Sequence, residues 1–117
     1  TEYVVWGSGK PMREFLYVED LAAACVHLMR SGYHGPLLNI GTGTDVTIRE
    51  LAELVMKVVG FKGRIVFDAT KPDGTPRKLL DVSAAAAQGW RAQVGLEEGS
   101  CQASTRRSMW RWLFAVS

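Results

Sequence analysis

The chain has 117 residues, of which 47% are hydrophobic and 22% charged, a balance that is typical of a folded domain and excludes general disorder. Its 14 basic and 12 acidic residues give a net charge of +2, which argues against a nucleic-acid-binding protein and against a polybasic membrane protein. No apolar run approaches the roughly 18 residues that span a bilayer, and no signal-like leader is visible. Two cysteines without a CxxC motif suggest a reducing compartment or simple burial more than a disulfide scaffold, and we expect a cytoplasmic protein.

The first predicted element is a strand over residues 2–6, which are β-branched and aromatic. The chain therefore opens inside an element, as we expect of a piece of a longer protein. Glycine and proline make residues 7–11 a turn. Residues 14–18 form a short extended run.

A helix is expected over about residues 20–30. Its apolar residues recur at helical spacing and predict one buried face, made of Leu21, Ala24, Cys25, Leu28 and Met29. Cys25 is accordingly expected to be a buried, unreactive thiol. Gly32 can end the helix in the left-handed conformation.

Residues 37–40 are predicted to form a second strand, and the turn Gly41-Thr42-Gly43 leads from it to the clearest helix of the chain. Thr47 and Glu50 have the spacing of a capping box, and Gly60 ends the helix. Six apolar residues predict its buried stripe: Ile48, Leu51, Ala52, Val55, Val58 and Val59.

The remaining elements are shorter. A third strand is predicted over residues 64–67, a charged loop over 71–78, and an alanine-rich helix over 84–87 that Gly89 ends. Strands and helices alternate, which predicts an α/β fold with few short strands and about four helices.

Two regions are predicted within the chain. Residues 1–99 carry the alternating elements, whereas residues 100–117 form an atypical tail with three arginines and no acidic residue. A helix over this tail would align Cys101, Thr105, Met109 and Trp112, but the pattern is poor and no function is assigned to it.

Two groups of side chains could bind a phosphorylated ligand. Trp6 ends the first strand and Arg13 follows the turn, so an aromatic face and a guanidinium could hold a base or sugar and a phosphate. Asp73, Arg77 and Lys78 lie in the charged loop, where the bases could bind a polyphosphate and the acid could accept a hydrogen bond. A packed tryptophan, a solvated arginine and an ordinary charged loop are the alternatives.

Other kinds of site lack their sequence patterns. Gly41-Thr42-Gly43 has the place of a dinucleotide-binding motif, but Val46 stands where the third glycine is required, which favours a simple turn. Gly7–Lys10 lacks the spacing of a Walker loop. His27 and His34 have no neighbours at metal-ligand spacing. We therefore predict no metal site, no cofactor site and no catalytic residue in these 117 residues.

Four motifs carry a resemblance to a known family. Residues 13–22 (Arg-Glu-Phe-Leu-Tyr-Val-Glu-Asp-Leu-Ala), and residues 39–43 followed by 47–52, resemble the C-terminal half of extended short-chain dehydrogenases/reductases. Residues 5–15 (Val-Trp-Gly-Ser-Gly-Lys-Pro-Met-Arg-Glu-Phe) and 71–81 (Lys-Pro-Asp-Gly-Thr-Pro-Arg-Lys-Leu-Leu-Asp) are similar to one family within it, the GDP-L-fucose synthases.

The resemblance covers about residues 1–99 and implies the C-terminal, substrate-binding part of such an enzyme, without its Rossmann domain. The family uses NADPH, bound by its N-terminal domain, to epimerise GDP-4-keto-6-deoxymannose and reduce it to GDP-L-fucose. Carried over position by position, Trp6, Arg13, Asp73 and Lys78 match substrate-binding residues. The family's catalytic residues have no counterpart here, so the chain alone is expected to be inactive and its parent enzyme to be a homodimer.

Two alternatives stay open. The chain could belong to another nucleotide-sugar epimerase or dehydratase, which a preference for UDP- or dTDP-sugars would reveal. It could also be a non-catalytic binding module, which the sequence upstream of Thr1 would decide.

Overall fold

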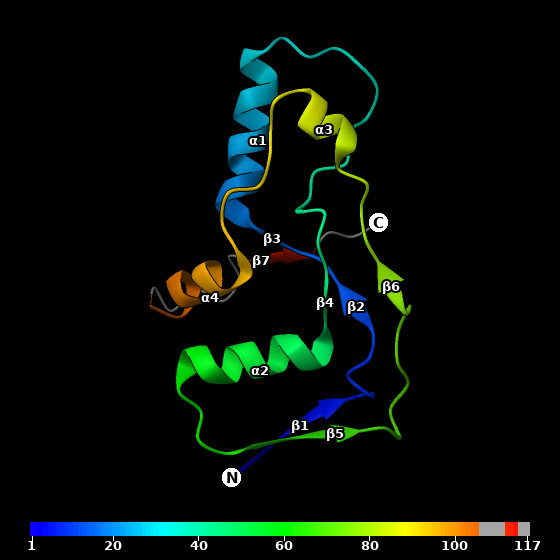
Figure 1. The fold of residues 1–117 in the computed structure, drawn as a ribbon, viewed down its shortest axis with the longest axis vertical. Coiled ribbons are helices and arrows are strands. Elements are labelled where there is room, and N and C mark those ends of the chain that lie inside the picture. The colour runs from blue at the N-terminus through cyan, green and yellow to red at the C-terminus, as the bar shows by residue number, and fades with distance from the viewer. Residues whose placement is uncertain (106–111, 115–117) are drawn as a thin grey trace.

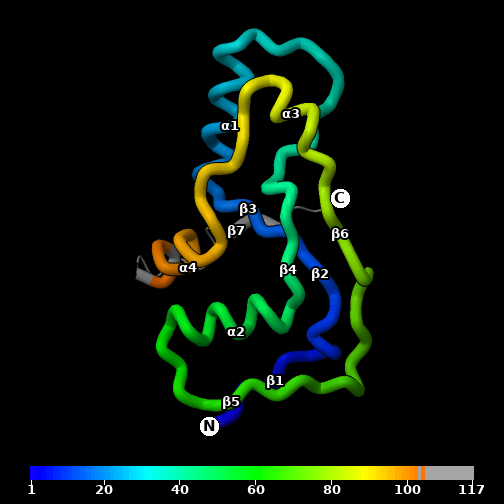
Figure 2. Tube along the Cα trace, in the orientation of Figure 1, coloured from blue at the N-terminus to red at the C-terminus, as the bar shows by residue number. Residues whose placement is uncertain are grey.

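The computed structural model describes residues 1–105 and 112–114, which form a flat, elongated molecule (Figures 1 and 2). At one end, helix α2 (Ile48–Val59) lies over strands β1 (Glu2–Trp6) and β5 (Arg64–Asp68). At the other end lie helices α1 (Val18–Arg30) and α3 (Ser83–Ala87).

Between these ends run the remaining elements, which are short. They are β2 (Met12–Arg13), β3 (Phe15–Tyr17), β4 (Val46–Thr47), β6 (Arg77–Lys78), α4 (Leu96–Thr105) and β7 (Trp112–Phe114). The predicted fold class is therefore confirmed: the described residues form a mixed α/β fold with four helices and several short strands. None of the described helices is long and apolar enough to cross a membrane.

The strands form three small sheets. Strands β1 and β5 pair in parallel, with Glu2 opposite Arg64 and Trp6 opposite Asp68. Strand β2 pairs with β4 on one side and β6 on the other, and β3 pairs with β7 in the antiparallel direction. Strand β2 thus joins two segments, β4 and β6, that are far from it and from each other in the sequence.

Helix α1 confirms the predicted helix and begins two residues earlier, at Val18. Gly32 ends the helix with φ 66°. The Gly32 N–H donates to Met29 O, and the Tyr33 N–H donates to Leu28 O. This pair of bonds is the Schellman arrangement, in which a left-handed glycine lets the last carbonyls find donors.

The predicted buried face of α1 is only partly correct. Cys25 is an exposed thiol, not a buried one, and Met29 is 81% exposed. Ala24 is fully buried, because it packs in a small core with Leu16 of β3 and with Ala85 and Trp90. These neighbours cover a strip of the helix narrower than its apolar face.

Helix α2 confirms the predicted capping box. The Glu50 N–H donates to Thr47 Oγ1 at 3.0 Å, the Thr47 N–H donates to Glu50 Oε2 at 2.8 Å, and Gly60 ends the helix with φ 71°. Its predicted stripe, in contrast, is only half-buried, with Val59 exposed. No residue of α2 is fully buried, because the two strands β1 and β5 are too narrow to cover the helix, and an apolar groove of about 440 Å³ remains between them.

The strand predicted over residues 37–40 is wrong. These residues are irregular and the Leu37 side chain is fully exposed. A strand requires a neighbour that pairs with its backbone, and within the described residues no strand pairs with this segment, whose contact with the segment around Asp81 is made by the Asn39 side chain.

The predictions for residues 64–67 and 84–87 are confirmed by β5 and α3, and Gly89 follows α3 with φ 85°. In the tail, α4 ends at Thr105 and Trp112 begins β7. The single helical face proposed for Cys101, Thr105, Met109 and Trp112 is therefore wrong for Trp112, and Met109 lies outside the described residues.

Candidate functional site

The candidate site lies where β1 and β5 end. Because these strands are parallel, their carboxyl ends meet at the same edge of the sheet, with Trp6 opposite Asp68. The turn 7–11 leaves from one strand and the loop 69–76 from the other. This geometry brings the two motifs that the sequence singles out into contact.

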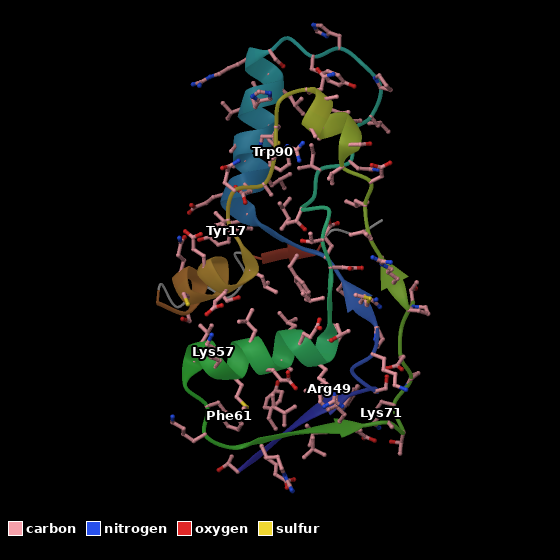
Figure 3. The ribbon with its side chains drawn as sticks, viewed as in Figure 1. Tyr17, Arg49, Lys57, Phe61, Lys71 and Trp90 are labelled. Atoms are coloured by element: carbon pink, nitrogen blue, oxygen red, sulfur yellow. The ribbon has the colours of Figure 1, made fainter. Side chains whose placement is uncertain are left out.

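The turn after β1 is held from several sides. The Gly7 N–H donates to Asp68 O at 2.9 Å, and the Arg49 N–H at the start of α2 donates to Gly9 O at 3.0 Å. The Arg49 guanidinium also lies over the Phe67 ring, 4.0 Å from its centroid (Figure 3 labels Arg49). Hydrogen bonds to the end of β5 and to the start of α2 therefore fix the position of the turn and of the residues beside it.

Asp73 is tied to this turn. Its Oδ1 accepts from the Ser8 N–H at 2.9 Å and its Oδ2 from the Ser8 hydroxyl at 2.6 Å. These bonds, with a smaller contribution from the charge of Lys10, hold the pKa of the Asp73 carboxyl below its ordinary value. Asp73 is thus an exposed, ionised acceptor.

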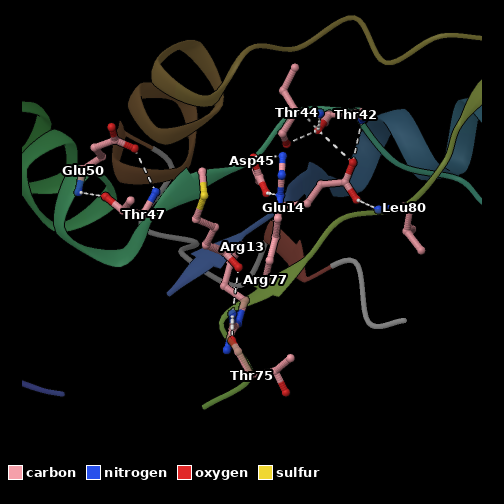
Figure 4. Close-up of polar contacts among 12 residues, drawn as sticks. Arg13, Glu14, Thr42, Thr44, Asp45, Thr47, Glu50, Thr75, Arg77 and Leu80 are labelled. Carbon is pink, nitrogen blue, oxygen red and sulfur yellow. Dashed lines mark hydrogen bonds and ion pairs between the residues drawn. The ribbon is translucent and has the colours of Figure 1, made fainter. Parts of the chain in front are cut away.

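Arg13 is tied to the other side of the same loop. Its Nη1 donates to Met12 O at 2.7 Å and to Thr75 O at 2.6 Å (Figure 4). A Cβ at Gly74 would come to 3.0 Å from Arg13 Nη2, so the backbone of the loop lies close against the guanidinium. Arg13 therefore keeps its charge at the site in a fixed place.

A small pocket of about 100 Å³ opens between these groups. Its lining residues are Trp6, Gly9, Pro11, Arg13, Ile48, Pro72, Asp73 and Gly74. The Trp6 side chain is 72% exposed, and Lys71 Nζ lies 5.0 Å from the centroid of its ring (Figure 3 labels Lys71). Trp6 and Arg13 of the first motif thus meet Asp73, about sixty positions further along the chain, at one place.

Lys78 lies apart from the lining of this pocket. It is in β6, opposite Arg13 in the strand register, and is half-buried. Its neighbour Arg77 is paired with Asp45, through bonds of 2.7 and 3.3 Å, and this carboxylate raises the pKa of Arg77. Of the two bases, Arg77 therefore already has an anionic partner.

The turn Gly41-Thr42-Gly43 binds a carboxylate of the chain itself. Glu14, which is 1% exposed, accepts from the Gly43 N–H at 2.6 Å, the Thr42 hydroxyl at 3.2 Å and the Leu80 N–H at 3.4 Å (Figure 4). A Cβ at Gly41 would come to 2.9 Å from the same carboxylate. The turn therefore does not fit a dinucleotide phosphate, because Glu14 fills the place of that anion.

Sequence reasoning missed three residues of this region. Ser8 and Lys71 stand inside the quoted motifs, but only their contacts with Asp73 and Trp6 reveal a role. No sequence pattern indicates the role of Glu14, because the N–H groups that donate to it belong to segments far along the chain. Within the described residues, no group of three or more His, Cys, Asp or Glu side chains could hold a metal ion.

Comparisons with known proteins agree with the motifs. Residues 1–41 match the model of the NAD dependent epimerase/dehydratase family. The chain is 59% identical over 102 residues to GDP-L-fucose synthase 1 of Arabidopsis thaliana, covering 86% of this chain and 31% of that protein. It is 56% identical over 107 residues to GDP-L-fucose synthase of Escherichia coli, covering 84% and 33%. The chain thus spans about one third of the length of these relatives.

The fold agrees with the sequence comparison. The structure of a GDP-mannoheptose C4 reductase from Campylobacter jejuni, solved with NADP bound, superposes with a TM-score of 0.78 at 32% identity, covering 90% of this chain and 34% of that one. Over most of its own length the chain is therefore homologous to about one third of a GDP-L-fucose synthase, and through these relatives it belongs to the extended short-chain dehydrogenase/reductase superfamily.

Proposed function

We propose that this chain is the GDP-sugar-binding part of an NADPH-dependent GDP-L-fucose synthase, which converts GDP-4-keto-6-deoxymannose to GDP-L-fucose. Residues 1–99 carry this function, and we assign none to residues 100–117, although α4 runs across this boundary and β7 pairs with β3. The observation that carries the proposal is the pocket in which Trp6, Arg13 and Asp73 meet. The names of the relatives supply the identity of the sugar nucleotide.

Each side chain has a role that its chemistry supports. Arg13 and Lys78 neutralise the diphosphate, since guanidinium and ammonium groups are the usual protein partners of phosphate oxygens. Trp6 packs its exposed ring against the base or the sugar. Asp73, which is ionised at neutral pH, accepts a hydrogen bond from a hydroxyl or from the base edge.

The proposal assigns no bond-making step to these 117 residues. NADPH supplies the hydride in the whole enzyme, and the turn that most resembles a cofactor loop is filled by Glu14. We propose that the cofactor is bound by parts of the whole enzyme outside this chain. We place that enzyme in the cytoplasm as a homodimer; the exposed thiols of Cys25 and Cys101 fit a reducing compartment.

Ligand binding tests the substrate class. We expect GDP-L-fucose to shift the NMR signals of the Trp6 indole and of the residue 71–76 backbone when it is titrated into the chain. Arg13→Lys keeps the positive charge but loses the planar set of guanidinium N–H donors, and should weaken binding several-fold. Arg30→Lys, at the far end of α1, is the control and should leave binding unchanged. Equal binding of UDP-glucose would favour the alternative, another nucleotide-sugar epimerase or dehydratase.

Turnover tests the enzyme class. The corresponding third of the E. coli relative can be replaced by this chain, since the two are 56% identical. We expect the chimera to consume NADPH when given GDP-4-keto-6-deoxymannose. A chimera that folds and binds NADPH but does not turn over this substrate would contradict the proposed function and favour a non-catalytic binding module.

A further inference from the structure

We infer that Ser8 is a positioning residue of this pocket: it holds the Asp73 carboxylate in the orientation in which that group meets a GDP-sugar. The inference rests on the proposed function of the pocket. It adds a residue whose side chain does not line the pocket and that acts through Asp73.

The contact between Ser8 and Asp73 uses both oxygens of the carboxylate. The Ser8 N–H donates to Oδ1 at 2.9 Å, and its hydroxyl donates to Oδ2 at 2.6 Å. Two donors on two different oxygens fix the plane of the carboxylate as well as its position. An ionised carboxylate has about four acceptor sites, so Asp73 keeps acceptor capacity for a ligand.

The direction of the Ser8 hydroxyl proton is itself determined by the turn. The Lys10 N–H donates to Ser8 Oγ at 3.2 Å and occupies an acceptor site of that oxygen. A serine hydroxyl has a single proton to donate, and Asp73 Oδ2 is the acceptor that lies within reach of it. Ser8 therefore has no remaining donor for a ligand, which makes it a support for Asp73.

Gly7 explains why the carboxylate can come so close to the turn. Gly7 is buried and has φ 95°, in the left-handed region that side chains disfavour. A Cβ at this position would lie 2.5 Å from Asp73 Oδ1. The glycine leaves room for the carboxylate, and the serine that follows binds it.

Other charged groups near Asp73 do not provide this orientation. Lys10 lowers the pKa of the carboxyl through its charge, Arg13 lines the same pocket, and Lys71 lies over Trp6. Of these three cations, Lys10 is the one whose charge favours the ionised form of Asp73. Among the hydrogen bonds of the described residues, the two from Ser8 set the direction in which Asp73 points.

A double-mutant cycle tests the inference by titration of the 117-residue chain with GDP-L-fucose. We expect Ser8→Ala to weaken binding about tenfold, as for the loss of one hydrogen bond to a charged group. Ser8→Thr, which keeps the hydroxyl, should restore most of the affinity. In the background of Asp73→Asn, Ser8→Ala should have almost no further effect, because the group that it orients has changed.

A second readout separates positioning from general stability. Ser8→Ala should raise the pKa of the Asp73 carboxyl, measured by NMR, toward its ordinary value. Ser31→Ala, which removes an exposed hydroxyl from the end of α1, should change neither this pKa nor the affinity.

Different binding results would contradict the positioning role of Ser8 and the proposed function. If the unmodified chain binds GDP-L-fucose and Ser8→Ala binds it equally well, or if the losses in Ser8→Ala and Asp73→Asn are additive, the positioning role is wrong and the proposed function stands. If the unmodified chain binds no GDP-sugar, the proposed function fails and the inference fails with it.

Discussion

At the scale of single residues, the fold is stabilised by carboxylates that accept hydrogen bonds from backbone N–H groups far along the chain. Glu14 joins the turn 41–43 to Leu80, and Asp20 accepts from the N–H groups of Gln93 and Val94 at 3.1 and 2.9 Å. Hydrogen bonds to an ionised acceptor are stronger than neutral ones. Each of these side chains therefore holds together segments that are far apart in the sequence.

The first prediction concerns the buried carboxylate. Glu14→Gln keeps the shape of the side chain but removes its charge and places an NH₂ group opposite backbone donors. We expect the Gly43 amide to exchange with solvent about 10- to 100-fold faster, corresponding to a loss of about 1.4–3 kcal/mol locally. Glu53→Gln, on an exposed position of α2, is the matched control and should leave the Gly43 exchange rate unchanged.

The second prediction concerns pH. The Ser8 bonds lower the pKa of folded Asp73 below the ordinary value, so their contribution to stability is present above about pH 4 and is lost as the pH falls through the lowered pKa. We expect the Ser8 amide signal in NMR to titrate with a midpoint below pH 4. Asp73→Asn should abolish this titration. A midpoint at pH 5 or above would show that Ser8 does not stabilise the ionised form.

At the scale of elements, helix ends are better specified than helix faces. Both long helices end at a left-handed glycine, Gly32 or Gly60, and α2 also begins with a capping box, whereas no side chain caps the start of α1. Their faces depend on partners that come from elsewhere in the fold. The narrow sheet β1–β5 leaves α2 half-buried.

The third prediction follows from the capping box. Thr47→Ala removes the acceptor of the Glu50 N–H, and we expect the first turn of α2 to lose about 1 kcal/mol. Hydrogen exchange of the Glu50 amide should become about fivefold faster. Thr47→Ser keeps the oxygen and should exchange like the unmodified chain; equal exchange in the alanine variant would mean that packing alone holds this turn.

At the scale of the whole molecule, the chain exposes more surface than a compact domain. Its accessible surface is 7779 Å², against about 6,300 Å² for a compact monomer of this mass. The radius of gyration is 16.1 Å, against about 13 Å for a compact chain of this length. Several large apolar side chains are exposed: Tyr3, Val4, Trp6, Val26, Met29, Leu37, Val59 and Leu79.

The fourth prediction follows from this shape. A small core with much exposed apolar surface supports little cooperativity, so we expect the 117-residue chain to bind a hydrophobic dye such as ANS and to unfold over a broad temperature range. Calorimetry and dye fluorescence measure both properties. A single sharp transition whose calorimetric and van't Hoff enthalpies agree, without dye binding, would contradict this expectation.

The sequence by itself determined the features that depend on neighbours a few residues away. The strand at 2–6, the helices with their capping box and glycine ends, and the turn at 7–11 follow from local spacing and backbone preference. The loop predicted over 71–78 is correct up to residue 76, and its last two residues form β6 because they pair with β2. The motifs around Trp6, Arg13, Asp73 and Lys78 were also visible, since they are contiguous.

Only the tertiary structure decided which of these features meet. It brings Ser8 to Asp73 across 65 positions, fills the turn 41–43 with Glu14, leaves Cys25 exposed and leaves residues 37–40 without a neighbouring strand. The physical reason is common to all four. Burial, strand pairing and hydrogen bonds between distant segments depend on where the whole chain places its partners, and no local pattern of residues carries that information.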